Sequence, residues 1–431
     1  MGLVRVLIVG SGGREHALAW VCRRDAPDTE VIVAPGNGGT ATIAENVALD
    51  VEDAQAVARL AADRAVDLVV IGPDAAAAAG VADACTERGV LVFGPTAAAA
   101  RIESSKTFAK QVMDAAGIPT ARWIAGGADR RRELSAFVAD LDGACVVKAD
   151  GLALGKGVLI CDTVDDAERA LDECLASMRF GDAGSHVVVE ERLSGPEISV
   201  FGLSDGTRVR TLVPARDHKR IFDGDRGPNT GGMGSIAPPP DIEPDAFAQE
   251  VSRTVLEPCV DALRERGSPF VGCLYAGLML TARGIRVLEF NARFGDPEAQ
   301  VVFPLLAEPA LELFTACARG DVATGTAGCM TGAAVGVVAA AAGYPGDVRR
   351  GDAITGLDAL DDGVLCFHAG TRRDSDGTLR TAGGRVLCVT AVGDSIGAAR
   401  VRAYANLARV HFDGMQARTD IGSPVTAGAH S

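Results

Sequence analysis

Two lysines and a cluster of glycines form the first candidate site, and their chemistry suits a polyphosphate. Lys148 ends an apolar, β-branched stretch, and Gly151, Gly155, Lys156 and Gly157 follow it. Glycines let backbone N–H groups approach an anion closely, and lysine ammonium groups add mobile positive charge. The spacing differs from a Walker loop, which has four residues between its first glycine and the Gly-Lys pair. Taken alone, the segment also fits a plain hairpin with surface lysines.

A second candidate site lies on a predicted strand that begins at residue 285. Residues two apart on a strand share a face, so Glu289, Asn291 and Arg293 should point the same way. A carboxylate and an amide oxygen suit magnesium, and a guanidinium group can grip a carboxylate or phosphate. Apolar neighbours are predicted to face a core on the opposite side: Leu288, Phe290 and Phe294. The alternative is the polar face of an edge strand, which the following Gly-Asp-Pro sequence disfavours.

A third candidate site follows the first predicted strand, 4–9, where a glycine-rich turn leads into a helical pattern. This arrangement begins like a dinucleotide-binding fingerprint, but Glu15 stands in place of the third glycine. The next predicted strand leads into Asn37 rather than into an acidic residue, so a nicotinamide cofactor is disfavoured. A helix N-terminus beside Arg14 still suits one phosphate, and an ordinary turn is the equal alternative.

The elements that position these residues follow an α/β pattern in the first hundred residues. Gly12, Asn37 and Asp74 fall at the carboxyl ends of predicted strands, where open α/β sheets bind ligands. Alternation with helical stretches predicts a small, doubly wound parallel sheet. Its four strands, each ending in a turn, are predicted within 4–9, 30–33, 67–74 and 89–96.

Beyond residue 100 the pattern changes. A helix is predicted to begin near Lys106, with Ser104 as its cap. Residues 122–190 are predicted to form a compact β/α unit that carries the glycine-rich segment. Antiparallel strands should follow, and the glycine-dense stretch 217–234 is predicted to be an irregular functional loop. The last hundred residues form a separate β/α unit in which the sequence reveals no chemistry.

Composition excludes several classes of protein. The 431 residues, 48% of them hydrophobic, predict about two to four globular domains. A formal net charge of -15 argues against non-specific binding to nucleic acid or to an anionic membrane. The 11 scattered cysteines predict free thiols in a reducing compartment rather than disulfides or a zinc site. With no apolar run of membrane-spanning length and no secretory signal pattern, the sequence predicts a cytoplasmic protein.

Several of these segments, taken together, resemble the phosphoribosylamine–glycine ligase family of the ATP-grasp superfamily. The Pro-Asn-Thr-Gly-Gly-Met-Gly and Asn-x-Arg-Phe-Gly-Asp-Pro-Glu segments are highly specific, whereas the glycine-rich segment alone indicates only the superfamily. The resemblance runs in order from about residue 3 to 422 and is carried by residues 12–17, 148–151, 155–158, 217–220, 227–234 and 289–298.

The resemblance implies an α/β ATP-grasp fold. The implied units are an N-terminal Rossmann-like substrate domain (1–103), a central ATP-grasp domain (104–121 and 191–326), a mobile lid domain (122–190) and a C-terminal β/α domain (327–426). The implied activity is ATP-dependent ligation of glycine to 5-phosphoribosylamine through glycyl phosphate, a step of de novo purine biosynthesis. Mg²⁺ or Mn²⁺ is the implied metal, and a monomer is expected.

The resemblance also assigns residues to roles. The expected ATP-binding residues are Lys106, Lys148, Gly151, Gly155, Lys156, Gly157, Glu190, Glu191, Leu193 and Glu197. The expected substrate-binding residues are Gly12, Gly13, Arg14, Glu15, Asn37, Asp74, Asp217, Lys219, Arg293, Gly295 and Asp296. Glu289 and Asn291 are the expected metal ligands. Lys148, Lys156, Arg293 and Asp217 are expected to serve catalysis.

One segment departs from the family pattern and keeps an alternative open. The chain reads Gly-Pro-Asp-Ala-Ala-Ala at 72–77, where the family usually has Gly-Pro-Glu-Ala-Pro-Leu. The alternative function is an ATP-grasp carboxylate–amine ligase with a different amine acceptor. A non-catalytic nucleotide-binding module is disfavoured because the lysines and the Glu-x-Asn set are intact.

Overall fold

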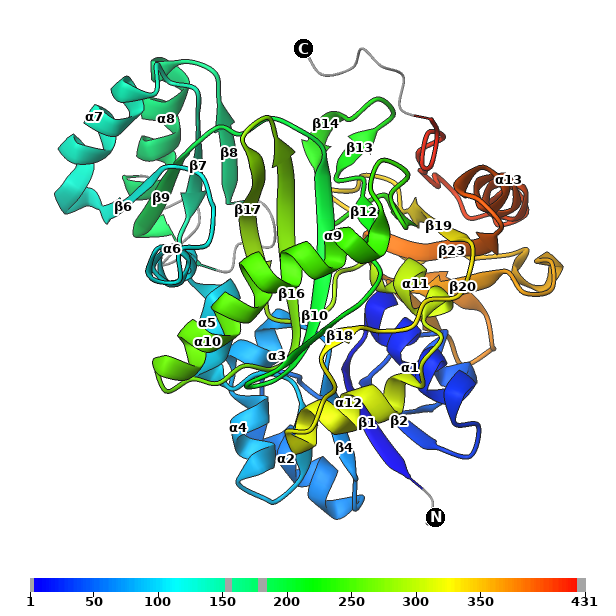
Figure 1. Cartoon of the computed structure of the whole chain (residues 1–431). Coiled ribbons are helices and arrows are strands. Elements are labelled where there is room, and N and C mark those ends of the chain that lie inside the picture. Colours follow the sequence, from blue (N-terminus) through cyan, green and yellow to red (C-terminus); the bar gives the residue numbers. More distant parts are fainter. Residues whose placement is uncertain (1–3, 152–156, 177–183, 425–431) are drawn as a thin grey trace.

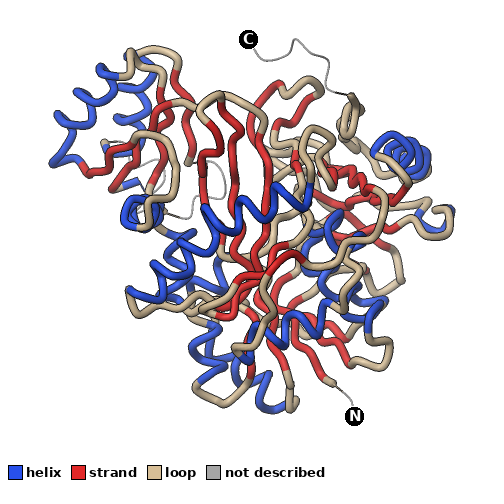
Figure 2. Tube along the Cα trace, viewed as in Figure 1, coloured by secondary structure: helices blue, strands red, loops and turns tan. Residues whose placement is uncertain are grey.

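The computed structural model describes residues 4–151, 157–176 and 184–424. Within them the strands form four larger sheets, which we call the N-terminal, small, central and C-terminal sheets, and two short hairpins. Figure 1 shows the N-terminal elements in blue at the bottom, and the C-terminal elements in orange and red at the right. Figure 2 shows the strands of the central sheet running through the middle of the molecule.

The N-terminal sheet confirms the predicted doubly wound parallel sheet. Its strands are β1 (Arg5–Gly10), β2 (Glu30–Pro35), β3 (Glu45–Asn46), β4 (Leu68–Ile71) and β5 (Leu91–Phe93), in the order β3-β2-β1-β4-β5 and all parallel. The strand β3 was not predicted, because a two-residue strand has no periodicity to detect. Its helices are α1 (Gly13–Asp25), α2 (Ala54–Asp63), α3 (Asp74–Ala78), α4 (Val81–Thr86) and α5 (Ala97–Ser104). The strand order reverses between β1 and β4, so the loops after these two strands flank one crevice.

The small sheet carries the glycine-rich segment. Its strands, β6 (Trp123–Gly127), β7 (Cys145–Ala149), β8 (Val158–Cys161) and β9 (His186–Glu191), are antiparallel in the order β6-β9-β7-β8. Two helices, α7 (Arg131–Asp140) and α8 (Val164–Leu175), pack with it around a core of its own. Figure 1 shows this unit at the upper left, apart from the other sheets.

The helix α6 (Lys106–Ala115) precedes the small sheet and corrects one prediction. Its cap is Ser105, whose hydroxyl accepts a hydrogen bond from the Phe108 N–H at 3.1 Å. Ser104 is instead the last residue of α5. Ser105 takes the cap because its extended backbone separates the two helices, and an N-cap needs a non-helical backbone.

The central sheet is antiparallel except where a short fifth strand joins it. Its strands are β10 (Glu197–Asp205), β11 (Val209–Thr211), β16 (Val271–Thr281), β17 (Gly284–Asn291) and β18 (Gly325–Thr326), in the order β17-β16-β10-β11-β18. One face packs against α9 (Pro244–Val251), a π-helical turn (Ser252–Leu256) and α10 (Glu257–Glu265). These three segments follow one another along the chain without a break. The other face packs against α12 (Ala310–Arg319).

A β-bulge in β17 overturns the predicted position of Leu288. Glu289 pairs with Gly277, whereas the next pair along the two strands is Leu278 with Val287. Leu288 is therefore the extra residue, and it lines a cavity instead of joining the core. A bulge shifts the alternation of side chains by one residue, and it leaves no sign in the sequence.

The C-terminal sheet mixes segments from distant parts of the chain. Its strands are β12 (Arg216–Asp217), β15 (Gly234–Ala237), β19 (Ala333–Ala340), β20 (Leu365–His368) and β23 (Arg385–Gly393), in the order β12-β15-β19-β23-β20. The helix α13 (Ile396–Leu407) packs on it, with β21 (Thr371–Arg373) and β22 (Leu379–Thr381) forming a hairpin. Short segments elsewhere are η1 (Thr40–Thr42), η2 (Ala128–Arg130), α11 (Ala299–Val302), η5 (Phe303–Leu305) and η6 (Leu357–Ala359).

The prediction of an irregular loop over 217–234 was wrong. This stretch contains the end of β12, the hairpin β13 (Arg220–Phe222)–β14 (Arg226–Asn229) and the start of β15. These strands are only two to four residues long, which is too short to show alternation in the sequence. Two strands of the C-terminal sheet, β12 and β15, thus come from the part of the chain that was expected to form the central domain. The division into domains stays a prediction.

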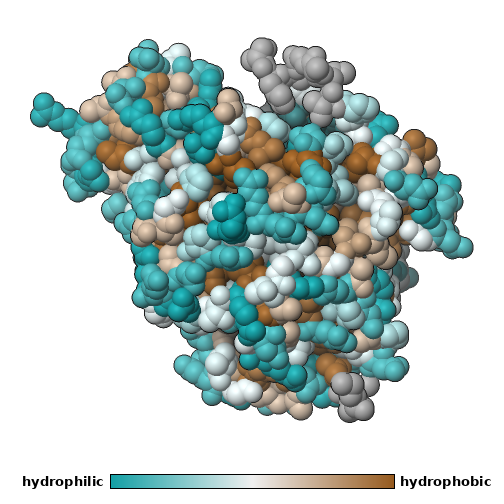
Figure 3. Space-filling view, in the orientation of Figure 1, coloured by the Kyte–Doolittle hydropathy of each residue, from teal (hydrophilic) through white to brown (hydrophobic). Residues whose placement is uncertain are grey.

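The visible face in Figure 3 is mostly hydrophilic, with smaller apolar areas among the polar side chains. No helix in the described part of the chain is both long enough and apolar enough to cross a membrane.

An aromatic cluster joins the N-terminal and central sheets. Phe294, which is 2% exposed, lies with its ring centroid 4.9 Å from Phe303, 5.9 Å from Phe314, 6.1 Å from Phe93 and 6.2 Å from Phe201. Aromatic rings bury large apolar areas, so this cluster stabilises the contact between the two sheets.

We expect Phe294→Ala to lower the free energy of unfolding by about 3–5 kcal/mol, because it leaves a cavity in a packed core. Urea denaturation followed by tryptophan fluorescence measures the change. Phe222→Ala is the control: its ring is 55% exposed, so the change should stay within about 0.5 kcal/mol. Equal losses in the two variants would contradict the assigned role of the cluster.

Candidate active site

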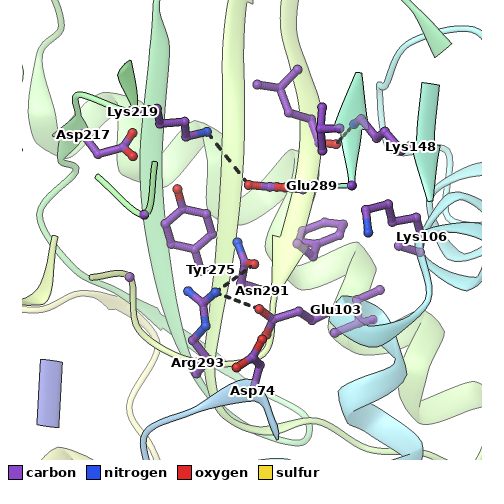
Figure 4. A pocket seen from close by; sticks show the side chains of 18 of the residues that line it. Asp74, Glu103, Lys106, Lys148, Asp217, Lys219, Tyr275, Glu289, Asn291 and Arg293 are labelled. Atoms are coloured by element: carbon purple, nitrogen blue, oxygen red, sulfur yellow. Dashed lines mark hydrogen bonds and ion pairs between the residues drawn. The ribbon is translucent and has the colours of Figure 1, made fainter. Parts of the chain in front are cut away.

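A cavity of about 380 Å³ lies where the four sheets meet, and it collects many of the predicted site residues (Figure 4). The predicted residues on its wall are Arg14, Asp74, Lys106, Lys148, Gly151, Gly157, Glu190, Asp217, Lys219, Glu289, Asn291, Arg293, Gly295 and Asp296. Gly155 and Lys156 lie outside the described residues. The cavity therefore joins the glycine-rich segment to the Glu-x-Asn strand, although about 130 residues separate them in the sequence.

Lys148 connects the small sheet to the central sheet. Its Nζ lies 2.8 Å from Glu190 Oε1 and donates a hydrogen bond to the Leu288 carbonyl oxygen at 3.1 Å. Lys106 Nζ donates to the Gly151 carbonyl oxygen at 3.0 Å. Burial lowers the pKa of Lys106, and Lys148 adds to this effect while Glu289 opposes it. Two ammonium groups thus face one cavity beside the glycine-rich segment.

Glu289 and Asn291 lie two residues apart on β17 and both line the cavity (Figure 4). Burial would raise the pKa of Glu289, but Lys219, Lys148 and Lys106 outweigh it and hold the pKa below its usual value. The Glu289 carboxylate is therefore ionised at neutral pH. Ionised carboxylate and amide oxygens are the hard donors that magnesium prefers. Across the described residues, no group of three His, Cys, Asp or Glu side chains is arranged to hold a metal ion.

Arg293 lies just beyond the end of β17 and is held by a carboxylate that the sequence analysis missed. Its Nη2 lies 2.8 Å from Glu103 Oε1, and Glu103 also accepts a hydrogen bond from the Ala292 N–H at 2.7 Å. Burial raises the pKa of Glu103, with Arg293 opposing and Asp74 adding to the shift. Glu103 looks like an ordinary helix residue in the sequence, because its partner is 190 positions away.

Lys219 and Asp217 form a second charged group on the wall. Lys219 Nζ lies 2.6 Å from Glu197 Oε2 and 3.9 Å from Glu289 Oε1, which raises its pKa despite its burial. Burial raises the pKa of Asp217 to about 8; Lys219 opposes the shift, and Glu298, Glu197 and Glu289 add to it. Glu197 does not itself line the cavity, but it fixes Lys219 there.

Two predicted substrate residues lie behind the cavity wall. Glu15 Oε2 accepts a hydrogen bond from the Gly12 N–H at 2.5 Å, and Glu15 Oε1 lies 2.5 Å from Arg14 Nε. A Cβ atom on Gly72 would collide with this carboxylate. Asn37 Nδ2 donates to the carbonyl oxygens of Ser11 and His368, both at 2.8 Å. These side chains hold the glycine-rich turn, and of its predicted members only Arg14 reaches the cavity.

The C-terminal sheet contributes Arg385, which the sequence analysis also missed. Its Nη1 donates to the carbonyl oxygens of Gly231 and Asp296, the second at 2.5 Å, and lies 3.4 Å from Asp296 Oδ1. Burial would raise the pKa of Asp296, but Arg385 and Arg14 outweigh it and lower the pKa. Arg385 follows a pair of glycines, and nothing around it in the sequence distinguishes it from a surface arginine.

Comparison with known proteins assigns this arrangement to a family. Models of phosphoribosylglycinamide synthetase match the chain over 4–103 (N domain), 104–299 (ATP-grasp domain) and 334–424 (C domain). A phosphoribosylamine–glycine ligase from Nostoc sp. is 44% identical over 431 residues, which cover 98% of this chain and 100% of that relative. The chain belongs to the phosphoribosylamine–glycine ligase family.

Solved structures support the same assignment. The crystal structure of phosphoribosylamine–glycine ligase from Thermotoga maritima matches with a TM-score of 0.84 and 35% identity, covering 97% of this chain and 100% of that one. The biotin carboxylase domain of 2-oxoglutarate carboxylase from Hydrogenobacter thermophilus, solved with MgADP, matches with a TM-score of 0.75 at 17% identity. It covers 96% of this chain and 91% of its own, and at this identity it shows the fold alone. The predicted α/β ATP-grasp fold is confirmed.

Three residues that the family resemblance assigns to ATP binding do not line the cavity. Glu191 and Leu193 do not line it, and the Glu191 carboxylate pairs with Arg283. Glu197 is engaged by Lys219, as described above. Glu190 does line the cavity, but its carboxylate is bound to lysines. The assignment of these residues to ATP stays a prediction.

A buried histidine pair anchors the turn of the N-terminal sheet to the C-terminal sheet. The His368 N–H donates to His16 Nδ1 at 2.8 Å, and the two rings lie 5.5 Å apart. Burial lowers the pKa of His16 to about 3, helped by His368, and lowers the pKa of His368 to about 4. Both rings are therefore neutral in the folded protein at pH 5, whereas the unfolded chain would bind protons there.

We expect the protein to lose stability as the pH falls from 7 to 5, by about 2 kcal/mol for each of the two histidines. The unfolded state binds more protons than the folded state in this range, so stability rises with pH. His16→Asn keeps an acceptor for the His368 N–H but does not titrate, and should flatten the dependence of thermal unfolding on pH. His411→Asn is the control, since that ring is 75% exposed; the assignment fails if both variants keep the wild-type pH dependence.

Proposed function

We propose that this protein joins glycine to 5-phosphoribosylamine at the expense of ATP, giving glycinamide ribonucleotide, ADP and phosphate. The proposal rests on one geometric observation: Lys148 of the small sheet and Glu289 of the central sheet line a single cavity. Phosphoryl transfer depends on alignment and charge neutralisation, and these two residues offer a cation and a carboxylate to the same ligand. Family membership adds the identity of the substrates.

ATP would extend its phosphates toward Lys106, Lys148 and the glycines at 151 and 157, with Gly155 and Lys156 expected to add to this group. The backbone of residues 190–193 would meet adenine, and Glu197 would take the ribose. Glu289 and Asn291 would hold Mg²⁺ or Mn²⁺ together with phosphate oxygens, and the metal would neutralise charge on the phosphates. Their donor set fits, because Glu289 is held ionised.

Glycine would bind through Arg293 and Asp217, which suit its carboxylate and its ammonium group. Arg14 and Asp74, with Gly295 and Asp296, would hold 5-phosphoribosylamine against the turn that Gly12, Gly13, Glu15 and Asn37 support. The four sheets around the cavity belong to one chain, so a monomer would suffice.

Two displacements complete the reaction. A carboxylate oxygen of glycine attacks the γ-phosphorus of ATP, and ADP leaves. The amine nitrogen of 5-phosphoribosylamine then attacks the acyl carbon of glycyl phosphate, phosphate leaves, and the nitrogen loses a proton. Glycyl phosphate hydrolyses readily, so closure of residues 122–190 over the central sheet would exclude water.

We expect phosphate release from ATP to require glycine and 5-phosphoribosylamine together. Lys148→Ala should lower kcat by about 10²-fold or more, because it removes a cation from the transferring phosphate. A coupled assay for phosphate measures both, and circular dichroism checks that the variant is folded. ATP turnover that is independent of the amine, or that proceeds with another amine instead, would overturn the proposed acceptor.

We expect Glu289→Gln to raise the Mg²⁺ concentration needed for half-maximal activity by about tenfold or more, since the metal loses an ionised ligand. Titration of activity with Mg²⁺ at saturating ATP gives this value. Glu312→Gln, an exposed residue of α12, is the matched control. An unchanged metal requirement in Glu289→Gln would remove this residue from the metal site.

A further inference from the structure

A buried cluster of three charged side chains lies in the wall of the cavity. Glu190 on β9 places one carboxylate oxygen 2.8 Å from Lys148 Nζ on β7 and the other 2.9 Å from Lys110 Nζ on α6. The Lys110 and Glu190 side chains are only 2% and 3% exposed, and that of Lys148 is 10% exposed. Ionised groups this deeply buried destabilise the fold unless they are paired, so the charges of the three side chains depend on one another.

The ammonium group of Lys110 is bound by two groups of the protein, although the residue also lines the cavity. Beside Glu190, its ammonium group donates to Thr120 Oγ1 at 2.7 Å, and the Thr120 hydroxyl donates to the Val287 carbonyl oxygen at 2.6 Å. This chain of contacts connects α6 to the small sheet on one side and to β17 on the other. Lys148 differs, because it also donates to the Leu288 carbonyl oxygen, next to Glu289 on the Glu-x-Asn strand.

The cluster contains two positive charges and one negative charge. Burial would raise the pKa of Glu190, but Lys148 and Lys110 outweigh it and lower the pKa. Burial lowers the pKa of Lys110 to about 8, and Glu190 opposes the shift, so Lys110 is charged at neutral pH. The cluster thus carries a net charge of +1, and Lys148 is its most exposed member.

We infer that Lys110 is a positioning residue that shares the Glu190 carboxylate and thereby leaves Lys148 with uncompensated positive charge for the phosphates of a nucleotide. The inference rests on the proposed ATP site and assigns a role to a lining residue that is not among the proposed ATP contacts. Without Lys110, Glu190 would neutralise Lys148 alone, and a buried carboxylate would face the incoming phosphates with no second partner.

The charge of Lys110 should matter for phosphates and not for the nucleoside. Lys110→Met keeps the length of the side chain and removes its charge. We expect it to weaken the binding of MgADP by about tenfold or more, because one buried charge near a polyphosphate is only partly screened at an effective dielectric constant of about 20. Adenosine, which has no phosphate, should bind as it does to the wild type.

A charge-balanced double variant separates this role from simple packing. Lys110→Met combined with Glu190→Gln removes one charge of each sign and leaves Lys148 with a net charge of +1, so MgADP affinity should recover toward the wild-type value. Thr120→Val is the control for geometry, since it breaks the hydrogen bond to Lys110 and keeps all three charges. It should leave the ratio of ADP to adenosine affinity unchanged.

Isothermal titration of the full chain with MgADP and with adenosine measures these affinities, and thermal unfolding checks the fold of each variant. Equal weakening of both ligands, unchanged MgADP affinity, or a double variant no tighter than Lys110→Met overturns the inference. If Lys110→Met does not fold, Lys110→Gln removes the same charge while keeping a hydrogen-bond donor, and carries the same expectation. Absence of MgADP binding by the wild type would instead refute the proposed function, so the two failures are distinguishable.

Discussion

The cavity depends on pairing of charges between elements that are distant in the sequence. The pairs are Lys148 with Glu190, Lys219 with Glu197, and Arg293 with Glu103. A concentration of cations suited to phosphates would repel itself and destabilise the fold if each were left unpaired. The paired carboxylates allow the cations to be brought together before any ligand binds. They also fix each side chain in place, which reduces the ordering that binding must supply.

The segment from Val287 to Glu298 connects this network to the rest of the molecule. Val287 and Phe290 belong to the core under α9 and α10, whereas Phe294 belongs to the aromatic cluster beside the N-terminal sheet. Between these buried residues, Glu289, Asn291 and Arg293 line the cavity. One short segment is therefore held by two cores while it presents polar groups to the site. A change in its path would disturb the packing and the site together, because the bulge at Leu288 sets which residues face each way.

The sequence predicted features that rest on local pattern and missed those that depend on tertiary partners. Apolar runs such as 6–9 predicted the parallel N-terminal sheet, because strands buried on both faces need such runs. The hairpin β13–β14 and the strand β15 were missed because they are too short to show a period. Glu103 and Arg385 were missed for a different reason: each resembles an ordinary surface residue until the fold brings Arg293 or Asp296 against it. Lys110 was missed for the same reason, because its role depends on contacts with residues 120 and 190 that the sequence does not reveal.

The carboxyl groups that line the cavity have pKa values shifted in opposite directions. Glu289 lies nearest to three lysines, which hold its pKa down and keep it ionised. Burial and neighbouring carboxylates raise the pKa of Asp217 and of Glu103. Lys219 opposes the shift at Asp217, and Arg293 and Arg14 oppose it at Glu103. An ionised carboxylate suits a divalent cation. A nearby ammonium group lowers the pKa of a carboxyl group and so favours its ionised form, and this effect matters most where the pKa is raised. The placement of lysines, rather than the choice among acidic residues, thus decides which carboxyl groups on the wall stay ionised and which bind a proton more readily.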